Sequence, residues 1–188
     1  RSSDLRLEAE RDAALRGFHL AFLAGEGYFD NTPCHRLTTS DSLSVLQCGD
    51  PTGTGTGGPG YTVADENLPK AGKNNYPAGT VAMAEPQGGQ AGSQFFLVYE
   101  DSTLPPDYTI VGHIDSGLDI LRQVAQGGVA PGSPSVDDGA PDLIWSAIPS
   151  ALRSARYCSL TLKTMSSFSF SGGARSAGSC GSAAMIFF

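Results

Sequence analysis

Apolar residues recur at helical spacing in two segments of the chain. In residues 8–24 they form one stripe, which Gly25 ends as a stop signal. In the second segment Ser116 precedes Asp119 by three residues, the spacing of a capping box at a helix start. The stripes consist of Leu15, Phe18 and Phe22 in the first segment and of Leu118, Ile120, Leu121, Val124 and Ala125 in the second. The pattern predicts two amphipathic helices, and the glycine pair at 127–128 ends the second.

Short apolar or β-branched runs lie between the two predicted helices. Stretches rich in Gly, Pro and Asn separate them, as turns separate strands. The runs are residues 43–47, 61–63, 80–83, 94–98 and 109–114. This spacing predicts an antiparallel sheet or barrel.

The character of the sequence changes near residue 144. No Asp or Glu follows Asp142, although four Lys and Arg residues do, and serine is dense from Ser150 to Ser182. The whole chain of 188 residues fits one domain of roughly 150 residues with a tail. We therefore expect residues 143–188 to be a largely disordered tail or a sequence foreign to the domain.

The charge balance limits the partners of the chain. Its 12 Lys and Arg residues and 19 Asp and Glu residues give a net charge of −7, which disfavours binding to nucleic acid or to an anionic membrane. No apolar run approaches the ~20 residues that span a bilayer, so membrane contact would need a segment outside this chain. We expect a cytoplasmic protein; a membrane-anchored or exported form stays open because the N-terminus looks incomplete.

The four cysteines of the chain are not spaced as metal ligands are. They are Cys34, Cys48, Cys158 and Cys180, with no CxxC pair and no zinc-type Cys/His cluster. Cys34 and Cys48 could approach one another if their strands pair. Free buried thiols are the favoured interpretation, as is usual in a reducing compartment, and no metal site is expected.

Two local patterns suggest chemistry that their context excludes. The glycine-rich run at 53–58 has the letters of a dinucleotide-binding loop, but Pro59 and Gly60 follow it in place of a helix, so a structural loop is expected. Cys34 and His35 are adjacent, and adjacent side chains of an extended strand point to opposite faces. They therefore cannot form a nucleophile and base pair.

With these patterns excluded, the remaining candidate site is a set of one arginine with other polar and apolar side chains that could line a cleft. The set is Arg36, Gln47, Gln94, Phe96, Leu104 and Tyr108. An arginine cannot act as a general base, but its fork of N–H donors can hold a lone pair in a partly dry cleft. These residues favour chemistry without proton transfer. The structural alternative is that Arg36 forms an ordinary surface ion pair and that Phe95 and Phe96 are core residues.

Five motifs occur in a fixed order along the chain. They are GYFDNTPCHRL at 27–37, VLQCGDPTGTGTGGPGY at 45–61, TVAMA at 80–84, GSQFFL at 92–97 and LPPDYTIVG at 104–112. Together they resemble the cyclophilin family of peptidyl-prolyl cis-trans isomerases, and the first two are similar to actinobacterial members. The resemblance covers residues 15–142.

The resemblance implies a mainly β fold, a closed antiparallel eight-stranded barrel capped by two helices, with the substrate groove on its outer face. Residues 1–14 do not resemble the two opening strands of the family, and the closing strand is absent after Asp142. We therefore expect the barrel to be incomplete at both ends in this chain.

The resemblance also assigns roles to individual residues. Arg36 matches the catalytic arginine of the family. The substrate-binding positions are Val45, Gln47, Ala84, Glu85, Gln94, Phe96, Leu104 and Tyr108. Among them Glu85 replaces the more usual Asn, and Tyr108 stands where many eukaryotic members have His.

Two further departures from the family affect its pocket. Ser44 stands where the family normally has Phe or Tyr on the pocket floor, and Leu43 would supply an apolar group there only after a register change. Thr103 stands where drug-sensitive members have Trp, so cyclosporin binding is expected to be weak.

The resemblance implies an isomerase that accelerates X-Pro rotation in protein folding without covalent chemistry or a cofactor. Its partners would be proline-containing peptides and unfolded proteins, and the chain would act as a monomer. The alternative is a proline-peptide-binding, chaperone-like module with weak or no turnover, which Ser44 and the missing strands favour.

Overall fold

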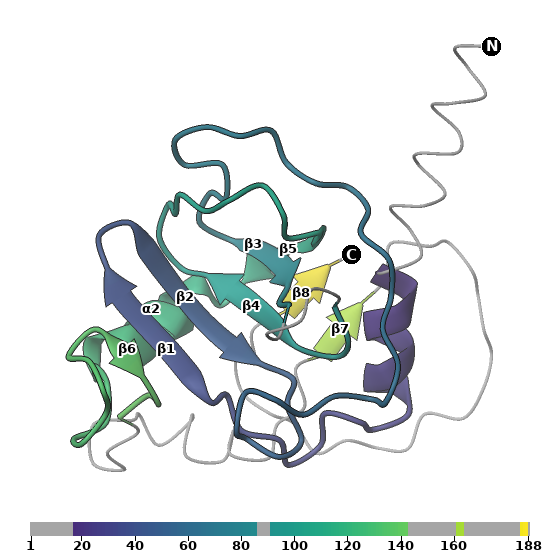
Figure 1. Cartoon of the computed structure of the whole chain (residues 1–188), viewed down its shortest axis with the longest axis horizontal. Coiled ribbons are helices and arrows are strands. Elements are labelled where there is room, and N and C mark those ends of the chain that lie inside the picture. Colours follow the sequence, from purple (N-terminus) through teal and green to yellow (C-terminus); the bar gives the residue numbers. More distant parts are fainter. Residues whose placement is uncertain (1–16, 86–90, 143–160, 164–184, 188) are drawn as a thin grey trace.

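A sheet of short strands forms the centre of the computed structural model, which describes residues 17–85, 91–142, 161–163 and 185–187 (Figure 1). Six strands form its antiparallel part, in the order β6-β1-β2-β4-β3-β5. Their bounds are β1 Arg36–Ser40, β2 Leu43–Cys48, β3 Thr80–Met83, β4 Phe95–Val98, β5 Ile110–Ser116 and β6 Asp138–Gly139.

Two three-residue strands extend the sheet beyond β5. The strand β8, Met185–Phe187, pairs antiparallel with β5, and β7, Thr161–Lys163, pairs parallel with β8. The strand order ends at β6 on one side and at β7 on the other, and within the described segments these two do not pair. The fold is thus mainly β, and its sheet is open. Apart from β7 and β8, the predicted tail at 143–188 lies outside the described residues, as does the segment 1–14.

Most of the predicted strands are present. Four of the apolar runs correspond to β2, β3, β4 and β5, whereas residues 61–63 form only an isolated bridge, between Val63 and Ala91. The sequence pattern missed β1, in which Leu37 is the only large apolar residue, and β6, which has only two residues. Strands this short leave no periodicity to detect.

Both predicted helices occur, and one of their predicted ends is wrong. The described part of the first helix covers residues 17–25, and α2 covers Leu118–Gln126 and ends before Gly127 as predicted. Ser116 belongs to β5 and forms no capping box; the N-cap is Gly117, with no side-chain cap bond. The reason is local: Gly117 has φ 90°, so a left-handed residue turns the chain directly from strand to helix.

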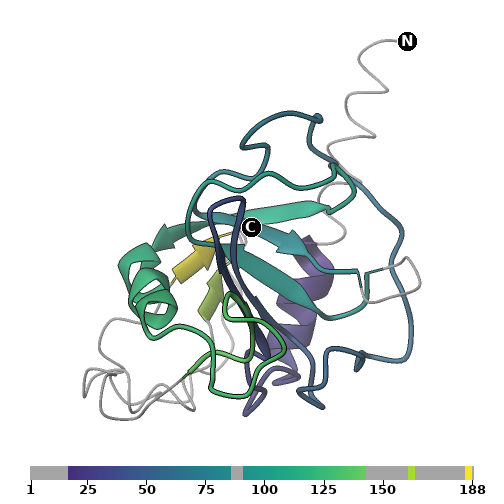
Figure 2. The same cartoon turned by 60° about the vertical axis from the view of Figure 1, so that its left-hand side comes forward.

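Side chains of the sheet alternate between two apolar clusters. We call them the inner cluster, which contains Leu46, Val81, Phe95 and Leu97, and the pocket cluster, which contains Val45, Ala82, Phe96 and Val98. Strands β2, β3 and β4 contribute to both clusters because successive residues of a strand point to opposite faces. Leu20 of the first helix and Leu121 of α2 pack in the inner cluster, so the two helices seal it, and both flank the sheet in Figure 2.

A disulfide joins Cys34 to Cys48, so the expectation of free thiols is wrong. The pairing of β1 with β2 sets Arg36 opposite Gln47, and this register brings the two cysteine Cα atoms to 4.0 Å. A backbone bond from His35 N to Gln47 O, 3.1 Å long, continues the ladder beside the disulfide. The sequence left this contact open because it depended on the pairing of the two strands.

No helix in the part of the chain that the structure describes is long and apolar enough to cross a membrane.

Candidate active site

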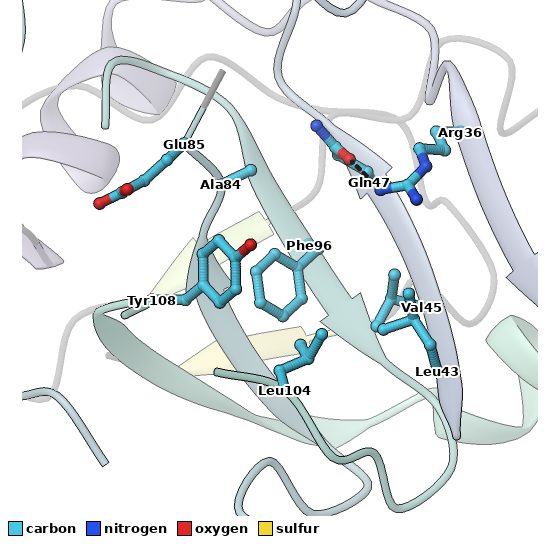
Figure 3. A pocket seen from close by; sticks show the side chains of 9 residues that line it. All are labelled: Arg36, Leu43, Val45, Gln47, Ala84, Glu85, Phe96, Leu104 and Tyr108. Atoms are coloured by element: carbon cyan, nitrogen blue, oxygen red, sulfur yellow. Dashed lines mark hydrogen bonds between the residues drawn. The ribbon is translucent and has the colours of Figure 1, made fainter. Parts of the chain in front are cut away.

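A pocket of about 170 Å³ opens on the outer face of the sheet, over the pocket cluster (Figure 3). Its lining consists of Arg36, Leu43, Val45, Gln47, Ala84, Glu85, Phe96, Leu104 and Tyr108. The three residues from β2 are alternate ones, so the period of the strand places all of them on one face. Phe96 comes from the neighbouring strand β4, and its register partner is Gln47.

The structure brings together every predicted site residue except Gln94. The Gln94 side chain is fully buried behind the pocket wall, where it touches Gln47 rather than open space. Leu43 also lines the pocket, although the sequence analysis assigned the pocket floor to Ser44 and allowed Leu43 there only after a register change.

Ser44 faces away from the pocket, so the prediction that it forms the pocket floor is wrong. Its hydroxyl donates to Ser40 O at 3.1 Å, inside the turn that joins β1 and β2. Its backbone N–H donates to Ser102 Oγ at 3.0 Å. The pairing Ser40↔Leu43 at this turn sets the alternation of β2, and that alternation directs Leu43 into the pocket. An apolar group therefore occupies the floor after all.

Aromatic rings form the apolar end of the pocket. Phe96 and Tyr108 meet edge to face, with centroids 5.5 Å apart and planes at 86°. Tyr76 lies behind both rings, fully buried, at centroid distances of 6.1 Å and 6.2 Å. Its hydroxyl donates to Tyr108 O at 3.0 Å and accepts from Tyr108 N at 3.1 Å. Tyr76 therefore fixes the backbone of Tyr108, and burial raises the pKa of Tyr76 to about 12.

A chain of hydrogen bonds forms the polar end of the pocket. Arg36 Nη1 donates to Gln47 Oε1 at 3.4 Å, the contact drawn in Figure 3. Gln47 Nε2 donates to Gln94 Oε1, and Gln94 Nε2 donates to Gly57 O, both at 2.9 Å. Gln94 thus orients Gln47 from behind the pocket wall.

The glycine-rich loop at 53–58 is held by one buried carboxylate. Asp50 accepts from the backbone N–H groups of Thr52, Gly55 and Gly57 at 2.7, 2.6 and 3.1 Å. Burial opposes ionisation of Asp50, but the Thr52 hydroxyl and these N–H groups outweigh it and hold the Asp50 pKa well below its usual range. The loop is therefore structural, as its sequence context predicted, and it carries the carbonyl that anchors Gln94.

His35 lies against this loop and not in the pocket. Burial lowers the pKa of His35 and so favours the neutral form of its ring. The disulfide occupies the sulfur of Cys34, which removes any thiolate next to His35. Over the described residues, no three His, Cys, Asp or Glu side chains gather as they would around a metal ion.

Arg36 is also half of an ion pair. Its Nε and Nη2 donate to Asp138 Oδ1 and Oδ2 at 2.8 and 2.7 Å. The paired carboxylate raises the pKa of Arg36, and the guanidinium lowers the pKa of Asp138. One edge of the guanidinium thus pairs with Asp138, while Nη1 on the other edge reaches Gln47 at the pocket.

The pocket thus combines an aromatic end with an arginine and a glutamine on the outer face of the antiparallel sheet. Residues 18–140 match the family described as "Cyclophilin type peptidyl-prolyl cis-trans isomerase/CLD". The chain belongs to this family.

Relatives with this family name come from several bacteria. The chain is 51% identical over 143 residues to "Probable peptidyl-prolyl cis-trans isomerase B" of Mycobacterium leprae, covering 71% of this chain and 47% of that protein. It is 38% identical over 108 residues to "Peptidyl-prolyl cis-trans isomerase B" of Bacillus subtilis, covering 57% of this chain and 72% of that protein. The chain therefore spans about half the length of its Mycobacterium leprae relative. A crystal structure of a Cryptosporidium parvum cyclophilin is similar with a TM-score of 0.49, at 29% identity, over 65% of this chain and 77% of that one.

Proposed function

We propose that this chain is a peptidyl-prolyl cis-trans isomerase that accelerates rotation about X-Pro bonds in proline-containing peptides and unfolded proteins. The observation that carries the proposal is the position of Arg36, whose Nη1 lies at the edge of the aromatic pocket beside Gln47. Membership of the family supports the same reaction.

The barrier to overcome is amide resonance, which makes X-Pro rotation cost ~18–20 kcal/mol and take tens to hundreds of seconds. In the twisted state the prolyl nitrogen becomes pyramidal and keeps its lone pair. A guanidinium N–H aimed at that nitrogen stabilises the lone pair and so weakens the partial double bond. The planar amide nitrogen is a poor acceptor, so the interaction is made mainly in the transition state, as catalysis requires.

The remaining residues hold the two sides of the bond. Phe96, Leu104 and Tyr108 form an apolar surface for the prolyl ring, with Leu43 and Val45 beside them. Gln47 is oriented by Gln94 and offers its amide to the neighbouring carbonyl. One side of the peptide is then fixed while the other turns. No proton is transferred, and the mechanism needs no cofactor.

Several finer properties belong to the same proposal. The family membership favours an eight-stranded barrel that is incomplete in this chain, and action as a monomer. Thr103 in place of Trp favours weak cyclosporin binding. The Cys34–Cys48 disulfide favours an oxidising compartment over the cytoplasm, since such bonds persist mainly outside reducing compartments.

The test measures turnover and binding separately. In a protease-coupled assay on an Ala-Pro peptide, the wild-type chain should accelerate isomerisation, and Arg36→Ala should lower kcat/KM by about 100-fold, roughly 2.7 kcal/mol. Peptide affinity, measured by NMR titration, should change little, and the far-UV circular dichroism should match the wild type. Peptide binding without any acceleration would select the chaperone-like alternative. A loss under threefold in Arg36→Ala would remove Arg36 from the mechanism.

The chaperone-like alternative has lost one of its two supports. It rested partly on Ser44 as a hole in the pocket floor, and Leu43 fills that position.

A further inference from the structure

The guanidinium of Arg36 is bound by the carboxylate of Asp138, which lies 102 residues further along the chain. Both oxygens of Asp138 accept from it, Oδ1 from Nε at 2.8 Å and Oδ2 from Nη2 at 2.7 Å. This is the two-bond fork geometry that fixes both the position and the plane of a guanidinium. The two bonds occupy Nε and Nη2 on one edge of the guanidinium. The remaining nitrogen, Nη1, contacts Gln47 at the pocket.

The backbone around Asp138 is itself fixed. The strand β6 pairs with β1 through Leu37↔Gly139 and Thr38↔Asp138, and Thr39 N donates to Asp137 O at 2.9 Å. A Cβ added at Gly139 would come within 2.4 Å of Ser133 Oγ, so only glycine lets β6 lie this close to the preceding turn. The constrained strand β6 therefore fixes the position of Asp138 beside Arg36.

The neighbouring acid does not share this contact. Asp137 accepts from the hydroxyl of Ser135, two residues earlier in the same turn. Of the two adjacent carboxylates, Asp138 alone pairs with the guanidinium. In a nonspecific acidic patch, either carboxylate could pair with Arg36, whereas here only Asp138 does.

We propose that Asp138 is a positioning residue for the isomerase reaction, which aims Nη1 of Arg36 at the prolyl nitrogen by holding the opposite edge of the guanidinium. The inference rests on the proposed function. An arginine side chain has many rotamers in water, and only those that place a donor over the prolyl nitrogen assist rotation. Asp138 acts by restricting that choice before the peptide arrives. Its removal should therefore lower turnover much more than peptide affinity.

The chain offers a matched control in a second ion pair. Arg122 and Glu100 are joined by the same kind of fork, at 2.8 and 3.3 Å, with side chains exposed to a similar degree as those of Arg36 and Asp138. Neither Arg122 nor Glu100 lines the pocket. Glu100→Ala therefore removes an equivalent pair without touching the site.

The experiment measures kcat and the peptide dissociation constant by NMR exchange spectroscopy on an Ala-Pro peptide. Asp138→Ala should lower kcat by about tenfold and change the dissociation constant less than twofold. Asp138→Asn, which keeps one acceptor oxygen, should recover part of the loss. Glu100→Ala should match the wild type in both quantities.

A second arm places Asp138→Ala in the Arg36→Ala background. If Asp138 acts through Arg36, the double variant should have the activity of Arg36→Ala alone. A further loss there, a wild-type kcat in Asp138→Ala, or a loss in affinity without a loss in kcat would each overturn the proposal. An inactive wild-type chain would instead overturn the proposed function, so the two failures are distinct.

Thermal unfolding separates positioning from folding. An exposed ion pair contributes little to stability, so Asp138→Ala and Glu100→Ala should have similar Tm values. If Asp138→Ala fails to fold, Asp138→Asn carries the test, because it has nearly the same shape.

Discussion

The inner cluster and the pocket cluster are built by the same strands, but they differ in what covers them. In β4, Phe95 and Leu97 point into the inner cluster, which the two helices seal. Phe96 and Val98 point into the pocket cluster, which is left open to a peptide. Alternate residues of one strand therefore serve stability and substrate contact separately.

The two clusters also differ in their polar partners. The inner cluster is apolar apart from a few buried polar contacts, such as the Tyr99 hydroxyl that donates to Thr38 O at 2.6 Å. The pocket cluster ends in the hydrogen-bonded wall of Arg36, Gln47 and Gln94. The comparison teaches that the inner cluster should govern folding and the pocket cluster should govern turnover, which adjacent substitutions can test.

The largest expected effect comes from Phe95→Ala. The Phe95 ring is 1% exposed and meets Phe29 edge to face at 5.5 Å, so its removal should cost about 3–5 kcal/mol of unfolding free energy. Phe96→Ala should cost less, because the space it leaves joins the open pocket and can fill with water, and yet it should lower kcat/KM more. Urea denaturation and the protease-coupled assay measure the two quantities. Equal effects on both would contradict the separation of the faces.

Reduction of the disulfide should have the next largest effect. It closes a loop of 14 residues in sequence separation, and the chain-entropy model gives ~3 kcal/mol for a loop of that size. Treatment with a phosphine reductant should lower Tm, with thiol alkylation as proof of reduction. Activity well below the new Tm should change less than twofold, because the bond from His35 N to Gln47 O still joins the strands. A large loss of activity with unchanged Tm would show that the disulfide acts on the pocket instead.

Acid should weaken the chain through Asp50. Its pKa is lower in the folded chain than the usual unfolded value of ~3.9, so its contribution to stability is present above about pH 4 and is lost as the pH falls below that. Asp50→Asn should cost about 1–3 kcal/mol at pH 7, since an amide cannot accept all of these bonds. The measurement is Tm between pH 7 and pH 2.5. The difference between wild type and Asp50→Asn should shrink on acidification, and a constant difference would contradict this assignment.

The smallest expected effect distinguishes the two faces of β2. Leu43→Ala removes apolar contact at the pocket floor worth about 1 kcal/mol, so KM should rise roughly fivefold. Ser44→Ala is the matched control: its hydroxyl contacts Ser40 O and the Tyr99 hydroxyl on the face away from the pocket, so its loss should leave KM unchanged. If instead Ser44→Ala raised KM and Leu43→Ala did not, the register of β2 described here would be wrong.

The sequence predicted those parts of the fold whose signal is local. Apolar runs predicted β2, β3, β4 and β5, and the glycines at 127–128 predicted the end of α2. The capping box failed because its letters occur at the end of a strand, where Gly117 makes the turn instead. A local sequence motif cannot reveal that Ser116, its first residue, is already paired in a sheet.

The site was predicted through motifs, and its supports were not. The pocket residues fall within recognisable motifs, whereas Tyr76 and Asp138 act through contacts with Tyr108 and Arg36 that only the tertiary fold creates. Ser44 was misplaced because a shift of one residue in a strand exchanges its two faces. The only signal that could have found Leu43 was the hairpin turn at residues 41–42, which sets the register.

The contact between Arg36 and Asp138 also bears on when the site can form during protein synthesis, because the two residues are far apart in the chain. Ribosomes make roughly 5–20 residues per second, so the 102 residues that separate the two take roughly 5–20 s to follow. The residues that line the pocket, the last of which is Tyr108, are all made before Asp138, so the nascent chain carries the whole pocket before it carries the strand that holds Arg36. The pair of Arg36 with Asp138 can therefore form only after β6 has left the exit tunnel.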